Sequence, residues 1–235
     1  MRRHTAARIA LGRSGSSLPT REVLAFGLAH AQARDAVHLP LDVSALRAQL
    51  EGEQFAVVEV ASRAADRAAY LARPDWGRRL QPEALAALKT MPRDAELVFV
   101  VSDGLSSTAV QSNAVPLLQA LMPLLTGIAI APVVIATQAR VALADEVGEC
   151  IAARIAVSLI GERPGLSSPD SLGAYITYAP KVGNTDEARN CISNIRPEGF
   201  AIGSAALLIA ANIRAALRAQ LSGVALRFDP SKALT

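Results

Sequence analysis

The chain has 235 residues, of which 51% are hydrophobic and only 4% aromatic, so it can bury a sizeable core of aliphatic side chains. Its net charge of +3 comes from 24 basic and 21 acidic side chains without a basic stripe, which argues against nucleic-acid binding. Cys150 and Cys191 form neither a Cys-x-x-Cys pair nor a cluster with histidine, which argues against a zinc site and favours the reducing cytoplasm.

The first 51 residues fall outside the regular alternation found later in the chain. Helical patterns predict a helix over residues 20–35, with Thr20 as its N-cap, and a short helix that starts at Asp42 or Ser44 and runs to Glu51. Runs typical of strands begin only after these two helices. We therefore expect an N-terminal helical segment (residues 1–51) beside a main domain (residues 52–235).

From residue 52 onward, short apolar runs alternate with helical patterns. Five runs rich in β-branched residues predict strands: Phe55–Ala61, Glu96–Ser102, Pro132–Thr137, Ile155–Ile160 and Ala174–Tyr178. Helices are expected over residues 82–90, from Ser106 or Ser107 onward, over residues 141–152 and over residues 204–221. This alternation predicts an α/β fold, with a parallel sheet of about five strands flanked by helices and a helical appendage at the N-terminus.

One uncharged stretch, from Ala114 to Ala136, is long enough to cross a membrane. Three prolines and one glycine interrupt it, and they divide it into helix, turn and strand. We therefore expect no membrane span here. The N-terminus lacks an apolar run of signal-peptide length, so no secretory leader is expected either.

Polar loops follow the predicted strands, where open parallel sheets bind their ligands. These loops comprise residues 102–104, 138–141, 161–170 and 179–200. They contain no histidine and no metal-ligand pattern, so a self-contained acid–base enzyme would be poorly equipped. Neither a Gly-x-Gly-x-x-Gly run after the first strand nor a Gly-x-Ser-x-Gly elbow occurs, which argues against a common dinucleotide fold and an α/β-hydrolase.

Five residues of these loops are candidates for ligand contact. Glu162 can accept hydrogen bonds from ligand amide or hydroxyl groups, or it can simply pair with the adjacent Arg163. Asp103 can orient a ligand or serve as a turn residue. Val141 opens a helix with free N–H groups, or it packs in the core. Cys191 has no neighbouring base in sequence, so it is expected to be a contact residue and not a nucleophile.

Four segments of the chain together resemble the small (light) subunit of ethanolamine ammonia-lyase. They are ARIALGRSGSSLPT (7–20), VSDGLSST (101–108), SLIGERPGLSSPDSLGAYITYAPK (158–181) and CISNIRPEGF (191–200). The resemblance implies a Rossmann-like, cobalamin-binding domain that pairs with a TIM-barrel large subunit in a higher hetero-oligomer. It also implies an ammonia-lyase that converts ethanolamine to acetaldehyde and ammonia by a radical mechanism, with adenosylcobalamin between the subunits and ethanolamine held by the large subunit.

The same resemblance assigns cofactor-binding residues. The family's cobalamin contacts correspond to Val141, Glu162 and Cys191, and we add their neighbours Arg163 and Asp103. No catalytic residue or metal ligand is expected on this chain, because the family places them on the large subunit. The chain has no Asp-x-His-x-x-Gly motif, so the cofactor is expected to bind base-on.

Two other readings stay open from the residues alone. The chain is either a stand-alone corrinoid- or nucleotide-binding module, or an independent small α/β enzyme that uses Asp103 and Glu162. The family's proteins lie in the cytoplasm or inside a bacterial microcompartment. The N-terminal extension linked to microcompartment delivery is short here, with six residues before Ala7, which counts against delivery by this chain.

Overall fold

A six-stranded sheet forms the centre of the molecule in the computed structural model, which describes residues 7–227. The strand order is β1-β3-β2-β4-β5-β6. The strands are β1 (Val57–Ala61), β2 (Leu97–Ser102), β3 (Val133–Thr137), β4 (Ile155–Gly161), β5 (Leu172–Tyr178) and β6 (Arg189–Ile195). This sheet and its flanking helices confirm the predicted α/β, Rossmann-like fold.

The last two strands differ from the prediction. The strands β1, β3, β2 and β4 are parallel, whereas β5 is antiparallel to β4 and β6 is antiparallel to β5. The link between β4 and β5 has no crossover helix, which a parallel neighbour would need. The sixth strand was missed because its sequence, RNCISNI, is mostly polar, although Ile192 and Ile195 are buried.

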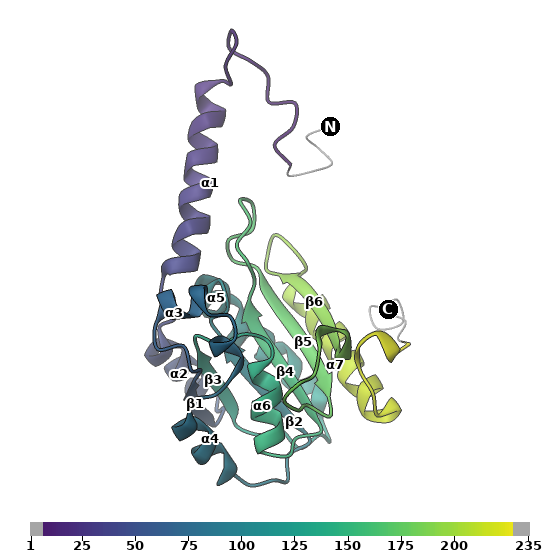
Figure 1. The fold of residues 1–235 in the computed structure, drawn as a ribbon. Coiled ribbons are helices and arrows are strands. Elements are labelled where there is room, and N and C mark those ends of the chain that lie inside the picture. Colours follow the sequence, from purple (N-terminus) through teal and green to yellow (C-terminus); the bar gives the residue numbers. More distant parts are fainter. Residues whose placement is uncertain (1–6, 228–235) are drawn as a thin grey trace.

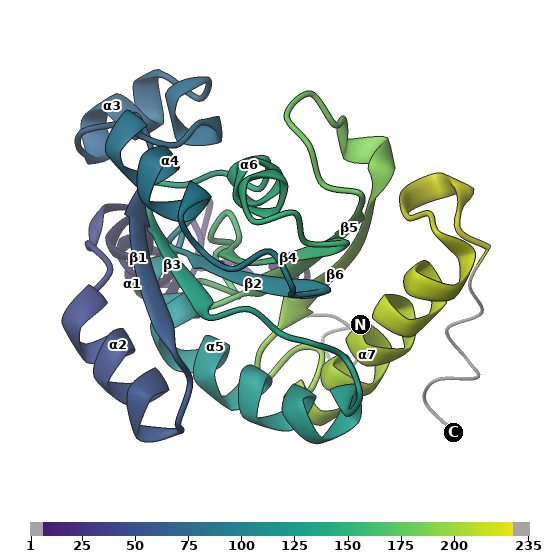
Figure 2. The same ribbon diagram turned by 90° about the horizontal axis from the view of Figure 1, so that it is seen from below.

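Helices cover both faces of the sheet (Figure 2). One face packs against α2 (Val43–Gly52), α5 (Ser107–Leu121) and α7 (Ile202–Ala219), and the other against α4 (Pro82–Lys89) and α6 (Leu143–Cys150). The central strand β2 is buried throughout. Its alternation sends Phe99 and Val101 into the first layer and Val98 and Val100 into the second.

Shorter elements complete the described part of the chain. They are α3 (Arg67–Ala72) and the 3₁₀ turns η1 (Trp76–Arg78), η2 (Met122–Leu125), η3 (Asp186–Ala188) and η4 (Gly223–Ala225). The uncharged stretch from Ala114 divides, as predicted, among α5, η2 and β3. Of the described helices, only α7 is long and apolar enough to cross a membrane, and it buries Ala205, Ile209 and Ile213 in the core.

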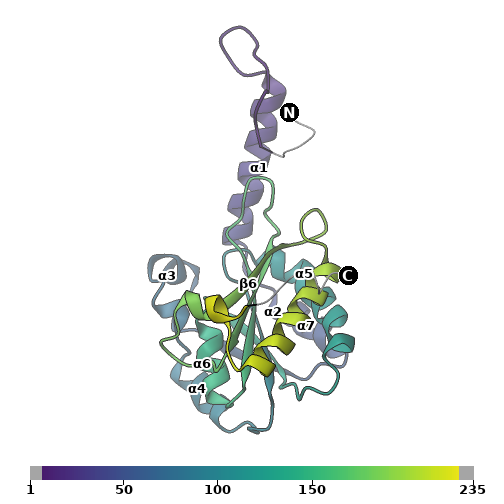
Figure 3. The same cartoon turned by 90° about the vertical axis from the view of Figure 1, so that its right-hand side faces the viewer.

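The helix α1 (Thr20–His38) projects from the body as an arm (Figures 1 and 3). Its N-cap is Pro19, without a side-chain hydrogen bond, so the prediction of Thr20 as the cap was wrong. Large apolar side chains on the arm are exposed, among them Leu24, Phe26 and Leu28. By contrast, α2 packs into the core through fully buried leucines, so within the N-terminal segment α1 is the helix that stands apart.

A buried ion pair joins α6 to β6. The Arg189 guanidinium donates to the Asp145 carboxylate, and both side chains are only 2% exposed. Arg189 also binds Asp186 at 3.0 Å, and Val182 N–H donates to Glu149 at the far end of α6 at 2.8 Å. These contacts hold the loop of residues 179–188 along α6.

The Asp145 carboxyl gives this ion pair a predicted pH dependence. Burial raises the pKa of Asp145 to about 6, and this effect outweighs the opposing effect of Arg189. The folded chain therefore keeps a proton that the unfolded chain releases between about pH 4 and pH 6. The quantity to follow is the free energy of unfolding of the wild type minus that of Asp145→Asn. We expect this difference to fall by on the order of 2–3 kcal/mol as pH rises through this window.

Urea unfolding at stepped pH measures this difference. The matched control is Asp186→Asn, which removes the exposed carboxylate bound to the same guanidinium. A difference that grows with pH would contradict the prediction, because Arg189 would then keep Asp145 ionised.

Candidate functional site

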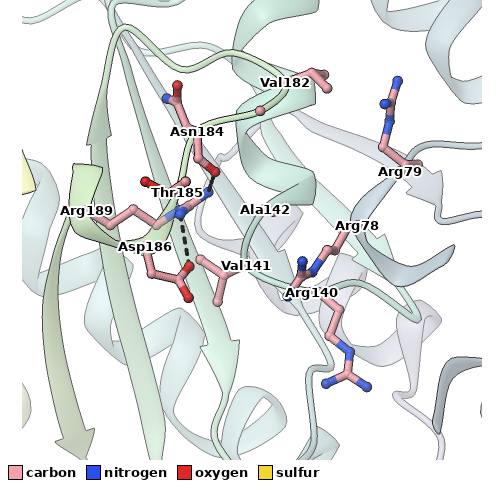
Figure 4. A pocket seen from close by; sticks show the side chains of 11 residues that line it. Arg78, Arg79, Arg140, Val141, Ala142, Val182, Asn184, Thr185, Asp186 and Arg189 are labelled. Carbon is pink, nitrogen blue, oxygen red and sulfur yellow. Dashed lines mark hydrogen bonds and ion pairs between the residues drawn. The ribbon is translucent and has the colours of Figure 1, made fainter. Parts of the chain in front are cut away.

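Two adjoining cavities at the carboxyl ends of the parallel strands form one open groove. The first, the arginine cavity, measures about 490 Å³, and the second, the Glu162 cavity, about 410 Å³. Arg140 and Val141 line both. The arginine cavity is further lined by Arg78, Arg79, Ala142, residues 182–186 and Arg189 (Figure 4), and the Glu162 cavity by Tyr70, Gly104, Leu105, residues 160–163 and Tyr175. Both cavities therefore lie at the edge of the sheet where the sequence predicted a ligand site.

One of the four predicted loops reaches the groove by a different route. Because β5 runs antiparallel to β4, residues 179–188 leave the sheet at the edge opposite the groove. They reach the arginine cavity only because they run along α6 to Arg189. The expectation that this whole loop starts beyond the carboxyl ends of the strands was therefore wrong.

Two glycines bring the ends of β2 and β4 together under the groove. Gly104 has a φ of +55°, and a Cβ there would lie 2.2 Å from the carbonyl oxygen of Gly161. A Cβ on Gly161 would lie 2.0 Å from the carbonyl oxygen of Ser106. Leu105 N–H donates to Gly161 O at 2.9 Å. Larger residues would separate the two strand ends that form the floor of the Glu162 cavity.

Glu162 has one carboxylate oxygen engaged and one free. Its Oε2 accepts hydrogen bonds from the Ser171 hydroxyl at 2.5 Å and from Asn194 N–H at 3.1 Å. No group among residues 7–227 donates to Oε1, and no ion pair forms with Arg163. Of the two sequence-based interpretations, the local ion pair is therefore wrong. The free oxygen can accept a hydrogen bond from a ligand amide or hydroxyl.

Cys191 lines neither cavity, but it lies beside Tyr175, which lines the Glu162 cavity. The two residues are register partners on β5 and β6, so their side chains lie next to each other on the same face of the sheet. Burial, with the nearby Glu162 carboxylate, raises the pKa of the Cys191 thiol, so it is protonated near neutral pH. Glu162, Tyr175 and Cys191 therefore form one cluster in which the thiol is a poor nucleophile.

Val141 lies at the junction of the two cavities. It precedes α6, and the N–H groups of Leu143 and Ala144 bond back to the carbonyl oxygens of Arg140 and Val141. Within the described residues, the N–H groups of Val141 and Ala142 donate no hydrogen bond. They are free donors at a helix N-terminus, where the helix dipole favours acceptor or anionic groups.

Asp103 lies beneath the groove and lines neither cavity. Its buried carboxylate accepts hydrogen bonds from the backbone N–H groups of Gly104 at 3.0 Å, Gln138 at 3.0 Å and Ala139 at 3.1 Å. Burial raises the pKa of Asp103, and these bonds oppose the shift. The carboxylate ties the end of β2 to the loop that carries Val141, so its geometry supports a positioning role and not ligand contact.

The cavities also contain residues that the sequence did not single out. Arg140, Arg78, Tyr70 and Tyr175 have no motif to mark them, although Arg140 falls in a predicted crevice loop. No group of three or more metal-ligating side chains occurs within residues 7–227. The two histidines in this range, His30 and His38, lie on α1 and line neither cavity. The titratable side chains that line the groove are therefore carboxylates, tyrosines and arginines.

Comparison with known proteins gives one consistent answer. A sequence profile described as ethanolamine ammonia-lyase light chain matches residues 1–227. The chain is 53% identical over 233 residues to the ethanolamine ammonia-lyase small subunits of Azotobacter vinelandii and Ralstonia nicotianae, covering 97% of this chain and 86% of each relative. It is 51% identical over 231 residues to that of Bradyrhizobium diazoefficiens, covering 97% of this chain and 88% of the relative. The chain therefore belongs to the ethanolamine ammonia-lyase light-chain family.

Proposed function

We propose that this chain works with a large subunit in an adenosylcobalamin-dependent ammonia-lyase that converts ethanolamine to acetaldehyde and ammonia. On this proposal the groove holds part of the cofactor. The observation that carries it is the free Oε1 of Glu162, which lies in a groove with free backbone donors. Such a surface is suited to bind and orient a ligand.

The chemistry of the groove fits a corrinoid. A corrin has apolar faces, and carboxamides project from its periphery. The Glu162 Oε1 can accept from a carboxamide N–H, and the free N–H groups of Val141 and Ala142 can donate to carboxamide oxygens. Val141, Leu105 and Ile160 supply apolar contact. When bound, adenosylcobalamin supplies the radical chemistry, and this chain supplies binding and orientation.

The remaining predicted site residues differ in how directly they would contact the cofactor. Arg163 lines the Glu162 cavity and is a direct contact candidate. Cys191 supports Tyr175 at the wall of the same cavity. Asp103 fixes the loop that presents Val141. That the cofactor binds base-on remains a prediction.

A large-subunit partner explains three features together. Each cavity is open and has room for only part of a molecule as large as a cobalamin. No histidine among residues 7–227 lines the groove, so a general acid or base for ethanolamine is assigned to the partner. The arm α1 leaves the body at the same end as the link between β4 and β5 (Figure 1), and its exposed apolar side chains suit burial in a hetero-oligomer. The two cysteines are unpaired, which fits the cytoplasm.

The subunit proposal is tested by omission. We expect acetaldehyde release from ethanolamine only when this chain, its co-expressed large subunit and adenosylcobalamin are all present, because the catalytic groups are divided among them. Each component is left out in turn. Full activity of the large subunit and cofactor without this chain would refute the proposal and favour a stand-alone corrinoid-binding module.

Glu162 is tested by cofactor affinity. Loss of a hydrogen bond to a charged group costs about 1.5–3 kcal/mol, so Glu162→Ala should raise the Kd for cobalamin about 10- to 100-fold in the assembled complex. Glu162→Gln, which keeps an acceptor oxygen, should lose less.

Equilibrium dialysis with cyanocobalamin measures both values. The matched control is Glu198→Ala, an exposed acid near the same edge that lines neither cavity. If Glu162→Ala bound as tightly as this control, Glu162 would have no contact with the cofactor.

A further inference from the structure

The arginine cavity contains more positive charge than its own carboxylates neutralise. Arg79 is paired with Glu146 at 2.8 Å, and Arg189 is paired with Asp145 and Asp186. Arg78 and Arg140 have no carboxylate within ion-pair distance among residues 7–227. Figure 4 places both on the same side of the cavity, opposite Asn184 and Thr185.

Arg140 is held rigidly in this position. Its guanidinium stacks on Tyr70 at 4.3 Å from the ring centroid and donates to the Tyr70 carbonyl at 3.1 Å. Its buried Nε has no partner. Its aliphatic stem passes over Gly77, where a Cβ would lie 2.9 Å from Arg140 Cγ. Arg140 N–H donates to Gly77 O at 2.7 Å, which brings the next residue, Arg78, to the cavity.

Two further donors face the same ligand position. The free N–H groups of Val141 and Ala142 lie at the start of α6 and line this cavity. Two guanidinium groups beside free backbone N–H groups form a site suited to a phosphate group. The one carboxylate on the rim, Asp186, is 96% exposed and bound to Arg189, so it opposes an anion only weakly.

We propose that Arg78 and Arg140 bind a phosphodiester, the one in the nucleotide loop of cobalamin. This inference rests on the proposed function, and it adds a second, anionic anchor to it. Cobalamin carries carboxamides and one phosphodiester in the same molecule. The two cavities share Arg140 and Val141, so one ligand can place a carboxamide at Glu162 and its phosphodiester at the arginine pair.

The test compares two corrinoids on the assembled large–small complex. Cyanocobalamin carries the phosphodiester, whereas dicyanocobinamide has the same ring without the nucleotide loop. Equilibrium dialysis gives both Kd values for wild type and for Arg78→Gln, whose replaced side chain forms no ion pair within residues 7–227. We expect Arg78→Gln to raise the Kd for cyanocobalamin about 10-fold or more and to change that for dicyanocobinamide less than about 2-fold.

Two further variants sharpen the comparison. Arg140→Lys keeps the charge but removes the planar guanidinium with its paired N–H donors. It should therefore also weaken the binding of cyanocobalamin only. Arg73→Gln removes an equal charge from an exposed residue of the same loop that lies outside the cavity, and it should leave both Kd values unchanged.

Each alternative has a distinct outcome. Equal weakening of both corrinoids, or loss of the large subunit on purification of Arg78→Gln, would overturn the phosphodiester assignment. If inorganic phosphate alone bound tightly to the wild type, the arginine cavity would be a site for free phosphate. That result would also overturn the phosphodiester assignment. If the wild-type complex bound neither corrinoid, the proposed function itself would fail.

Discussion

The groove depends on how the ends of the parallel strands are joined. The Asp103 carboxylate accepts three backbone N–H groups and so ties the end of β2 to the loop after β3. Next to it, Gly104 and Gly161 approach so closely that no side chain fits between β2 and β4. Three strand ends are therefore fixed relative to one another, and Val141, Glu162 and Arg140 take their positions from them. Arg67 lies 3.6 Å from the same carboxylate and gives this buried charge an ionic partner.

A binding surface with little chemistry of its own follows from this construction. Ser171 and the Asn194 N–H hold the Glu162 carboxylate, and the Tyr70 carbonyl and ring hold the Arg140 guanidinium. The free backbone donors lie before α6, and Arg78 is brought to the cavity by the backbone bond between Arg140 and Gly77. None of them is a proton-transfer pair. This pattern fits a subunit that orients a large cofactor, while the groups that act on substrate belong to a partner.

Much of this arrangement could be predicted from local patterns. The first four strands are apolar runs whose signal is local, so they were found nearly to the residue. The rule that ligands bind at the carboxyl ends of parallel strands then brought Val141 and Glu162 to one edge. The direction of β5 and the existence of β6 were missed, because a polar edge strand resembles a loop and the pairing register is a tertiary property.

The arginine pair could not be predicted for a related reason. Arg78 meets Arg140 only because Gly77 admits the Arg140 stem and accepts its N–H, a contact between segments far apart in sequence. Asp103 illustrates the reverse case. Its place after a strand suggested ligand contact, and only the three backbone N–H groups that surround it show that it holds the site together.

The most direct measurement is a cryo-EM structure of the large–small complex with cyanocobalamin bound. We expect the corrin to lie between the subunits, with a carboxamide within hydrogen-bond distance of Glu162 and the ring edge in contact with Val141. A cofactor held entirely by the large subunit, with this groove facing solvent, would contradict that expectation and leave the chain without a cofactor-binding role.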